Sequence, residues 1–225
     1  MSLVSFLVPY RPDGGRRDEN WSWVRARLAA VPGCEIVVGT SPRGPFNRAA
    51  AVNDAATRAV GEVLCVHDAD CALPLDWYQA VRGLDGWVLP EGSRYLTAAA
   101  TAGLISRSPA ATIAEGLDAE EEVEHSVGGI MALSRSAFDT ARGMDARFVG
   151  WGPEDAAFAL CLETLVGPSD RFGGPLVHLW HPREPHARPW QPGVGDLMGK
   201  YWAAHGDPAR MRALRPYEPK EQTDA

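Results

Sequence analysis

Residues 1–90 alternate between short apolar runs and longer amphipathic stretches, and this alternation limits the fold more than any other feature of the sequence. Short apolar runs bounded by turn residues predict buried strands, while apolar residues at helical spacing predict helices. Because strand–helix–strand units place their strands in parallel, we expect an α/β fold: a Rossmann-like, mostly parallel central sheet with helices on both faces. The predicted strands are 3–8, 35–39 and 62–67, and the predicted helices are 18–30, 46–60 and 74–82.

The second part of the chain has fewer clear elements. Small residues and an acidic run in 91–124 predict a mobile loop or a solvated surface excursion, two alternatives that the sequence leaves open. Ligands of such sheets bind beyond the carboxyl ends of the strands, so polar residues that follow strands are the candidates for function. Further predicted elements are strands at 129–133 and 176–179, and helices at 134–141, 154–166 and 194–205.

Composition limits the partners. The chain of 225 residues has a net charge of −7, whereas a nucleic-acid backbone or an anionic membrane surface would attract a basic protein. No apolar stretch approaches the roughly 20 residues of a membrane span, and the first residues show neither the basic region nor the cleavage site of a signal peptide. The four cysteines lack CxxC spacing, so we expect reduced thiols in a cytoplasmic protein.

Two aspartates, Asp68 and Asp70, follow the third predicted strand. Alternation along an extended chain would point both carboxylates to the same side. Such carboxylates repel each other unless a cation or a proton intervenes, so they form half of a Mg²⁺ or Mn²⁺ site that would hold a nucleotide phosphate. Aspartates after a strand are also common turn formers, and the pair alone leaves both interpretations open.

Two histidines, His178 and His181, follow the strand predicted at 176–179. Imidazole binds first-row transition metals, and both rings would face one ion if the chain turned after Leu179. Because imidazole suits Mn²⁺ better than Mg²⁺, the histidines and the aspartate pair together favour Mn²⁺, with Mg²⁺ as the alternative. A purely structural role of the histidines is the competing interpretation.

A glycine-rich segment at 150–155 precedes a predicted helix. A proline and two acidic residues in the first turn form an ordinary helix start. The glycines also allow a close approach of a ligand, and the ring of Trp151 could face a sugar. Glu154 could then orient a hydroxyl group, and Asp155 could accept its proton.

Aromatic and cationic side chains follow the first strand and begin the second predicted helix. Phe46 could flank a base, and Arg48 could reach a diphosphate. Tyr10 and Arg11, directly after Pro9, supply a further aromatic ring and a further cation. Either segment could also be a plain surface turn.

Together these segments resemble the glycosyltransferases with a GT-A fold, and the likeness is closer to the β-1,4-galactosyltransferase family and its bacterial and family-2 relatives. The likeness covers about residues 3–182. The segments that carry it, in the order and spacing of the family, are 46–49, 66–70, 128–134 and 150–155.

The resemblance implies a single GT-A catalytic domain at 1–215 and a polar tail at 216–225. Within the domain it implies a nucleotide-binding half at about 1–90 and an acceptor and metal half at about 125–215.

The metal-binding roles of that family fall on four residues of this chain. The resemblance implies that Asp70 binds Mn²⁺ directly and that Asp68 reaches the ribose or the outer ligands of the metal. His181 matches the metal-binding histidine of the family, and His178 stands where the family has a methionine. We therefore expect a metal site of Asp70, His178 and His181, with Asp68 beside it.

The donor-binding and catalytic roles carry over in the same way. The resemblance implies that Phe46 and Arg48 hold the uracil and the phosphate, with help from Arg11. It further implies that the donor sugar lies close to the backbone of Gly129. Asp155 becomes the general base, and Glu154 becomes the carboxyl group that orients the acceptor.

The sequence departs from the family at several positions. Pro153 replaces a glycine that usually precedes the acidic pair, and Ala156 and Ala157 replace further acidic residues that often follow it. The membrane anchor and the disulfides of the family are absent from the sequence. These differences leave the acceptor and the preference for galactose open.

The function implied is metal-dependent transfer of a hexose or N-acetylhexosamine from a UDP-sugar to a hydroxyl of a glycan or another acceptor, with inversion. A sugar-nucleotide nucleotidyltransferase is one alternative, but its basic glycine-rich loop would follow the first strand directly, whereas the nearest segment here, 13–17, lies several residues later. A non-catalytic glycan-binding domain is the other alternative, but it would not need Asp155, Asp70 and His181 together.

Overall fold

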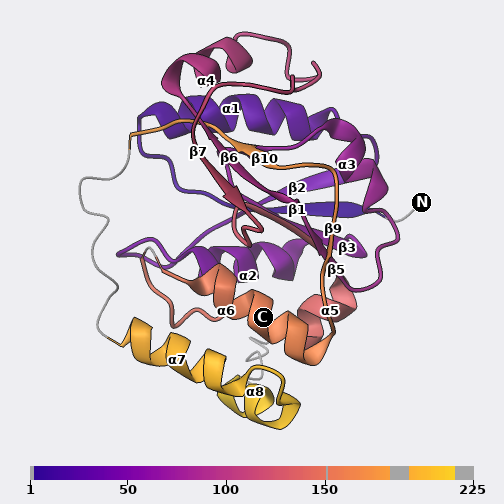
Figure 1. Ribbon diagram of the computed structural model, residues 1–225, viewed down its shortest axis with the longest axis vertical. Coiled ribbons are helices and arrows are strands. Elements are labelled where there is room, and N and C mark those ends of the chain that lie inside the picture. The colour runs from indigo at the N-terminus through magenta and orange to yellow at the C-terminus, as the bar shows by residue number, and fades with distance from the viewer. Residues whose placement is uncertain (1–2, 151, 183–192, 216–225) are drawn as a thin grey trace, which may run out of the picture.

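The computed structural model describes residues 3–150, 152–182 and 193–215. Helices lie on both faces of a central sheet, and a smaller sheet continues from one side of it (Figure 1). The α/β class and the arrangement of the layers agree with the sequence prediction.

Three parallel strands begin the central sheet. β1 (Val4–Pro9) pairs with β2 (Cys34–Gly39) on one side and with β3 (Val63–His67) on the other. β1 and β3 are buried along their whole length, as expected of strands that helices cover on both faces. The three strands predicted in this part of the chain are confirmed to within one residue at each end.

The other half of the central sheet contains a strand of the opposite direction. β8 (Ile130–Ser134) pairs antiparallel with β3 and with β5 (Trp87–Leu89), and β5 pairs in parallel with β9 (Asp170–Arg171). The strand order is β2-β1-β3-β8-β5-β9. Because β8 runs antiparallel to β3, the residues that precede β8 lie beside the carboxyl end of β3.

One layer of helices contains α2, α5 and α6, and two C-terminal helices pack on its outer side (Figure 1). The C-terminal helix α8 was not predicted. The bounds in this layer are α2 (Arg48–Arg58), α5 (Arg135–Thr140), α6 (Glu154–Leu165), α7 (Val194–Ala204) and α8 (Pro208–Leu214).

The opposite face of the sheet is covered by α1 (Arg16–Ala29), α3 (Leu75–Ala80) and α4 (Ala98–Ile105), which share a second apolar core (Figure 1). Arg27 of α1 is buried, and its guanidinium donates to the carbonyl of Leu73 from both Nε (3.1 Å) and Nη2 (3.0 Å). This bond fastens α1 to the segment between β3 and α3.

The smaller sheet has the strand order β4-β10-β6-β7. It joins segments that lie far apart in the sequence: β4 (Cys71–Ala72), β10 (Leu176–His178), β6 (Gly92–Leu96) and β7 (Ala119–Glu124). Because β4 begins four residues after β3, this sheet extends from the carboxyl edge of the central sheet.

The prediction that residues 91–124 form a loop is wrong, because this segment contains β6, α4 and β7. β6 pairs antiparallel with β7, from the same segment, and in parallel with β10, which lies far away in the sequence. β7 carries the acidic run as an exposed strand, and Glu122 accepts a 2.8 Å hydrogen bond from Arg94 of β6.

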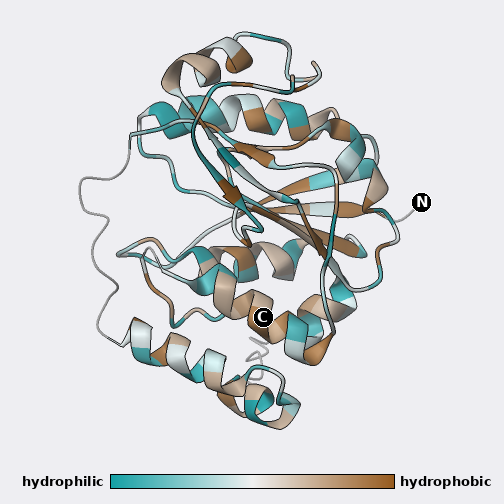
Figure 2. Cartoon of the chain, viewed as in Figure 1, coloured by the Kyte–Doolittle hydropathy of each residue, from teal (hydrophilic) through white to brown (hydrophobic). Residues whose placement is uncertain are grey.

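Apolar residues gather in the central strands and on the sides of the helices that face them (Figure 2). All four cysteines are free, as predicted. In the described parts of the chain, every helix is too short or too polar to cross a membrane.

Candidate active site

The two aspartates after β3 lie in a turn. The prediction of an extended chain here is wrong, because the Cys71 N–H donates to the Asp68 carbonyl (3.2 Å) and closes the turn. The Asp68 N–H donates to the carbonyl of Gly129 (2.8 Å), which fastens the turn to the start of β8. As a result, the carboxylates of Asp68 and Asp70 have different partners and belong to two neighbouring clusters.

Asp70 lies at the centre of the first cluster. Its carboxylate is buried, with Oδ1 3.6 Å from Nε2 of His178 and Oδ2 3.3 Å from Nε2 of His181. Nε of Arg17 lies 3.4 Å from Oδ2. Burial opposes the ionisation of Asp70, but the charges of His178, Arg17 and His181 outweigh it and lower the pKa of Asp70. Asp70 is therefore an anion at neutral pH.

The donor atoms of this cluster fit a divalent cation. One carboxylate and two imidazoles offer the oxygen and nitrogen ligands that suit Mn²⁺ better than Mg²⁺. The buried Nε of Arg17 lies close to Asp70 but has no hydrogen-bond partner among the described residues. Asp68, which the resemblance placed beside the metal, is bonded to Arg48 in this structure.

The backbone that carries the two histidines is held from three directions. The Leu179 N–H donates to the Asp70 carbonyl (2.8 Å), and the Trp180 N–H donates to Oγ1 of Thr101 in α4 (2.8 Å). Asn20 of α1 donates to the Trp180 carbonyl (3.1 Å). The chain therefore turns directly after β10, and both imidazoles reach Asp70.

Tyr95 of β6 orients the first of these imidazoles. It lies opposite His178 in the β6–β10 register, and the two rings pack with their centroids 4.7 Å apart at an interplanar angle of 31°. The ring of His181 packs on the other histidine with a centroid distance of 5.4 Å. The three rings form a row beside the carboxylate of Asp70.

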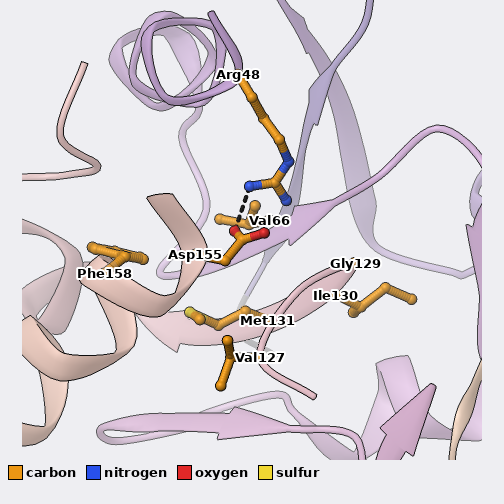
Figure 3. A pocket seen from close by; sticks show the side chains of 8 residues that line it. All are labelled: Arg48, Val66, Val127, Gly129, Ile130, Met131, Asp155 and Phe158. Carbon is orange, nitrogen blue, oxygen red and sulfur yellow. Dashed lines mark hydrogen bonds and ion pairs between the residues drawn. The ribbon is translucent and has the colours of Figure 1, made fainter. Parts of the chain in front are cut away.

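Arg48 lies at the centre of the second cluster. Its guanidinium is bonded to Asp155 (Figure 3). It is also bonded to Asp68 (2.8 Å from Nε to Oδ1), and Nη1 lies 3.9 Å from Oε1 of Glu154. The side chain of Arg48 is only 13% exposed. Arg48 therefore joins the carboxyl end of β3 to the first turn of α6.

Apolar side chains line the pocket around this ion pair (Figure 3). They exclude water from it, so the charges interact more strongly than they would in solvent. The pocket is lined by Val66, Val127, Ile130, Met131 and Phe158, together with Gly129 and the two charged residues.

The loop that leads into α6 is fastened to α2. Asn47 caps α2 by accepting from the Ala50 N–H (2.8 Å) and also donates to the Ala146 carbonyl (2.7 Å). Asn53 of α2 makes two hydrogen bonds with the backbone of Met144. These bonds explain how a residue at the start of α2 meets one at the start of α6.

The two acidic residues at the start of α6 have raised pKa values. Burial raises the pKa of Glu154 to about 8, and the neighbouring charge of Asp155 adds to the rise. Burial also raises the pKa of Asp155, which Arg48 lowers and Asp68 raises further. Oε2 of Glu154 is buried and has no hydrogen-bond partner among the described residues. At neutral pH Glu154 is therefore a protonated carboxyl group with a free oxygen.

Two glycines border these clusters for different reasons. Gly129 has a φ of +88°, and a Cβ there would lie 2.9 Å from Leu176 and 3.1 Å from Sγ of Cys71. Packing therefore already requires glycine at this position, whether or not a donor sugar lies beside its backbone. A Cβ on Gly128 would lie 3.0 Å from Oδ2 of Asp155. Gly128 thus leaves room for the carboxylate of Asp155.

The donor-side residues predicted from the sequence lie along the loops after β1 and before α2. The Arg11 guanidinium lies 5.3 Å from the centre of the Phe46 ring and donates to the Gly44 carbonyl (2.8 Å). Tyr10, after Pro9 at the end of β1, donates from its hydroxyl to Asp18 of α1 (2.5 Å). Trp151 lies outside the described residues.

Sequence reasoning missed three residues of this region. Arg17 lies at the end of the basic segment 13–17, which was considered only as a phosphate loop. Tyr95 and Cys71 are the cross-strand neighbours of His178 in β6 and β4. The two consecutive arginines at 16–17 could have indicated a cation in the site. The places of Tyr95 and Cys71 depend on a strand register that the sequence does not reveal.

Comparison with known proteins shows which family and which folds the chain is similar to. The family model described as the N-terminal domain of galactosyltransferase matches residues 109–165, a minor part of the chain that includes Gly128, Glu154 and Asp155. No curated protein matches the sequence.

Solved structures share the fold over most of the chain. The catalytic domain of Drosophila β1,4-galactosyltransferase 7 in complex with xylobiose is 19% identical, with a TM-score of 0.54 over 85% of this chain and 75% of that chain. A mutant of the same protein in complex with manganese, UDP-Gal and xylobiose has a TM-score of 0.58 at 19% identity, over 85% of this chain and 76% of that chain. GalNAc-T7 with UDP, GalNAc and Mn²⁺ has a TM-score of 0.53 at 10% identity, over 95% of this chain and 54% of that chain.

The chain therefore has the GT-A fold, the fold class that these glycosyltransferases define. Within this class, the likeness extends to β1,4-galactosyltransferases, in agreement with the resemblance that the sequence motifs indicated.

Proposed function

We propose that this protein is a metal-dependent glycosyltransferase that moves a hexose or N-acetylhexosamine from a UDP-sugar to an acceptor hydroxyl group, with inversion. The observation that carries the proposal is the meeting of two clusters at one edge of a GT-A sheet. One cluster is the cation-binding set around Asp70, and the other is the pair of carboxyl groups beside Arg48. Transfer needs a metal that holds the donor close to a base that activates the acceptor, and this edge of the sheet brings the two clusters together.

Asp70, His178 and His181 would hold the cation, Mn²⁺ or else Mg²⁺, which offsets the negative charge that develops on the departing UDP. Phe46 and Arg11 offer an aromatic face and a cation for the uridine and diphosphate. Arg17, beside Asp70, adds a second cation close to where the diphosphate would lie. Arg11 and Arg17 would thus offset the charge of the diphosphate in a protein whose net charge is −7.

Asp155 acts as the general base. Its pKa is raised, which strengthens a carboxylate as a proton acceptor at neutral pH. It removes the proton of the acceptor hydroxyl while the acceptor oxygen attacks the anomeric carbon in line and the bond to UDP breaks. Arg48 opposes this rise in the pKa of Asp155, because its charge lowers the pKa of the carboxyl group and favours the ionised form.

Glu154 orients the acceptor. Its carboxyl group is protonated at neutral pH and has a free buried oxygen, so it can donate a hydrogen bond to an acceptor oxygen. The two adjacent carboxyl groups therefore perform different tasks because their surroundings differ. Asp155 is paired with Arg48, whereas Glu154 is not within hydrogen-bonding distance of Arg48.

The role of Arg48 differs from the one that the resemblance implied. Its guanidinium faces Asp68, Asp155 and Glu154, so we assign it to these carboxyl groups and leave the diphosphate to Arg11 and Arg17. Asp68, held by Arg48, remains the candidate for the ribose.

A UDP-release assay with a panel of nucleotide sugars tests the proposal. We expect UDP to form with at least one UDP-sugar, slowly with water as the acceptor, in the presence of Mn²⁺ and not in EDTA. Release of pyrophosphate products would instead identify a nucleotidyltransferase. Absence of any turnover, combined with metal-independent binding of glycans, would identify a glycan-binding domain.

A further inference from the structure

Cys71 occupies an unusual position beside the cation-binding cluster. In the antiparallel pair of β4 and β10 it lies directly opposite His178. Side chains of such cross-strand partners project to the same face, with their Cβ atoms about 5 Å apart. The thiol of Cys71 is therefore directed to the side of the sheet on which the imidazole lies.

The thiol also approaches the carboxylate of the cluster. Sγ of Cys71 lies 3.9 Å from Oδ1 of Asp70. One ligand atom from each of Asp70, Cys71 and His178 lies within 4.8 Å of the other two. A tetrahedral zinc ion, with bonds of about 2.0–2.3 Å, holds its ligands about 3.5 Å apart. Small side-chain rotations are enough to bring the three atoms onto one ion.

We propose that Cys71 is a ligand of the same cation as Asp70, His178 and His181, so that this chain binds zinc-like metals more tightly than Mn²⁺. The inference rests on the proposed function, because it concerns the same metal site. Thiolate sulfur favours Zn²⁺ and Co²⁺ over Mn²⁺, and the affinities of mixed nitrogen, oxygen and sulfur sites generally rise from Mn²⁺ to Co²⁺. The thiol proton leaves to solvent when the sulfur coordinates.

The proposal has a consequence for activity. Asp70, Cys71 and His178 supply three close ligand atoms, and His181, whose Nε2 lies 3.3 Å from Asp70, would be the fourth ligand of a tetrahedral zinc site with no open position, as in structural zinc sites. Zn²⁺ held by Cys71 would therefore exclude the donor diphosphate from the metal. Zn²⁺ should act as an inhibitor of the Mn²⁺-dependent reaction, and this inhibition should depend on the thiol.

Titration of the full-length protein with Co²⁺ tests the proposal without measuring activity. Bound Co²⁺ gives visible bands from any ligand set, and a cobalt–thiolate bond adds an intense charge-transfer band in the near ultraviolet. We expect both sets of bands in the wild type. In Cys71→Ser and Cys71→Ala we expect the visible bands to remain and the charge-transfer band to disappear. The matched control is Cys161→Ser, because Cys161 is also buried and free but lies in α6; it should keep both.

Affinities measured by competition with Zn²⁺ give a second readout. Loss of even an outer partner of a metal ligand costs about 10–100-fold in affinity, so Cys71→Ser should weaken Zn²⁺ binding by at least about tenfold and Mn²⁺ binding much less. Visible bands without a charge-transfer band in the wild type would overturn the role of Cys71 and leave the proposed function intact. Absence of all cobalt bands would overturn both, because the metal site itself would be missing.

Discussion

The guanidinium of Arg48 donates a hydrogen bond to the carboxylate of Asp155, although 107 positions separate the two residues in the sequence. Arg48 is the first residue of α2, and Asp155 lies in the first turn of α6. The same guanidinium holds Asp68 after β3. This one side chain therefore connects the donor side of the proposed site to its general base.

Replacing the proposed base should remove catalysis and spare binding. In Asp155→Asn we expect kcat to fall by about 10²–10⁴-fold, the usual contribution of general base catalysis. The affinity for UDP should stay close to that of the wild type, because the role proposed for Asp155 concerns the acceptor and not the nucleotide. Steady-state kinetics and calorimetry measure the two quantities. Asp139→Asn, an exposed position on α5, is the control, and equal activities of the two variants would exclude Asp155 as the base.

Removing the charge of Arg48 should destabilise the protein. In Arg48→Met the carboxylates of Asp68 and Asp155 lose their shared counter-ion, and breaking a buried ion pair costs about 3–5 kcal/mol. Arg48→Lys keeps the charge and should lose less. Urea denaturation measures both free energies of unfolding. Because Arg48 lowers the pKa of Asp155, the acid limb of the kcat–pH profile should also move to higher pH in Arg48→Met. An unchanged limb would disprove the coupling.

Glu154 should make stability depend on pH. Its pKa is about 8 in the folded protein and 4.5 in its ordinary state, so between these values the folded state binds a proton that the unfolded chain has released. The free energy of unfolding should therefore fall as the pH rises from about 4.5 to about 8. Glu154→Gln, which mimics the protonated form, should show a shallower fall. If the free energies of unfolding of the wild type and of Glu154→Gln changed equally with pH in denaturation series, the raised pKa of Glu154 would be contradicted.

A methyl group at Gly128 should disturb the base. A Cβ there would lie 3.0 Å from Oδ2 of Asp155, so the carboxylate has to shift by a few tenths of an ångström. A 1 Å misplacement costs about 10²-fold, and we expect a fall of roughly tenfold in kcat for Gly128→Ala. Gly103→Ala is the control, because nothing lies within 4 Å of its Cβ position in α4. A Gly128→Ala variant with full kcat would show that Asp155 tolerates the shift.

Removal of the central metal ligand should abolish metal-dependent nucleotide binding. Asp70 is the residue on which both histidines converge, so Asp70→Ala removes the only carboxylate from the proposed ligand set and leaves the imidazoles and the thiol of Cys71. Calorimetry of UDP binding with Mn²⁺ and with EDTA measures the effect. We expect the wild type to bind UDP only with Mn²⁺ and the variant to bind it in neither condition. Equal UDP binding by the wild type in EDTA would contradict the metal site.

The regular elements near the start of the chain could be predicted from local patterns. The apolar runs of β1, β2 and β3 are bounded by turn residues, and their burial requires no knowledge of distant residues. The polar segments after strands could also be identified from the local pattern. An aspartate or histidine that ends a strand is exposed at the edge of the sheet.

Elements that depend on distant partners were missed. β6 is short and moderately polar, and it forms a strand between two partners, β7 on one side and β10 on the other. The turn at Asp68 was misjudged although the bond that closes it is local; the bond that fastens it, from the Asp68 N–H to the carbonyl of Gly129 just before β8, depends on a distant segment. Local propensity cannot reveal such pairings, because their stability arises from contacts that close long loops.

The sequence by itself determined the fold class and the kinds of side chain available at the site. The alternation of strands and helices indicated the fold class. The aspartate, histidine and glutamate–aspartate segments indicated the side chains available at the site. Only the tertiary structure decided which of these side chains meet: Arg48 with Asp155, and Cys71 with His178. It also decided that Glu154 is protonated while its neighbour is paired with an arginine. The physical reason is that charge and metal chemistry depend on burial and on distances of a few ångströms, which chain segments far apart in sequence acquire only when they pack.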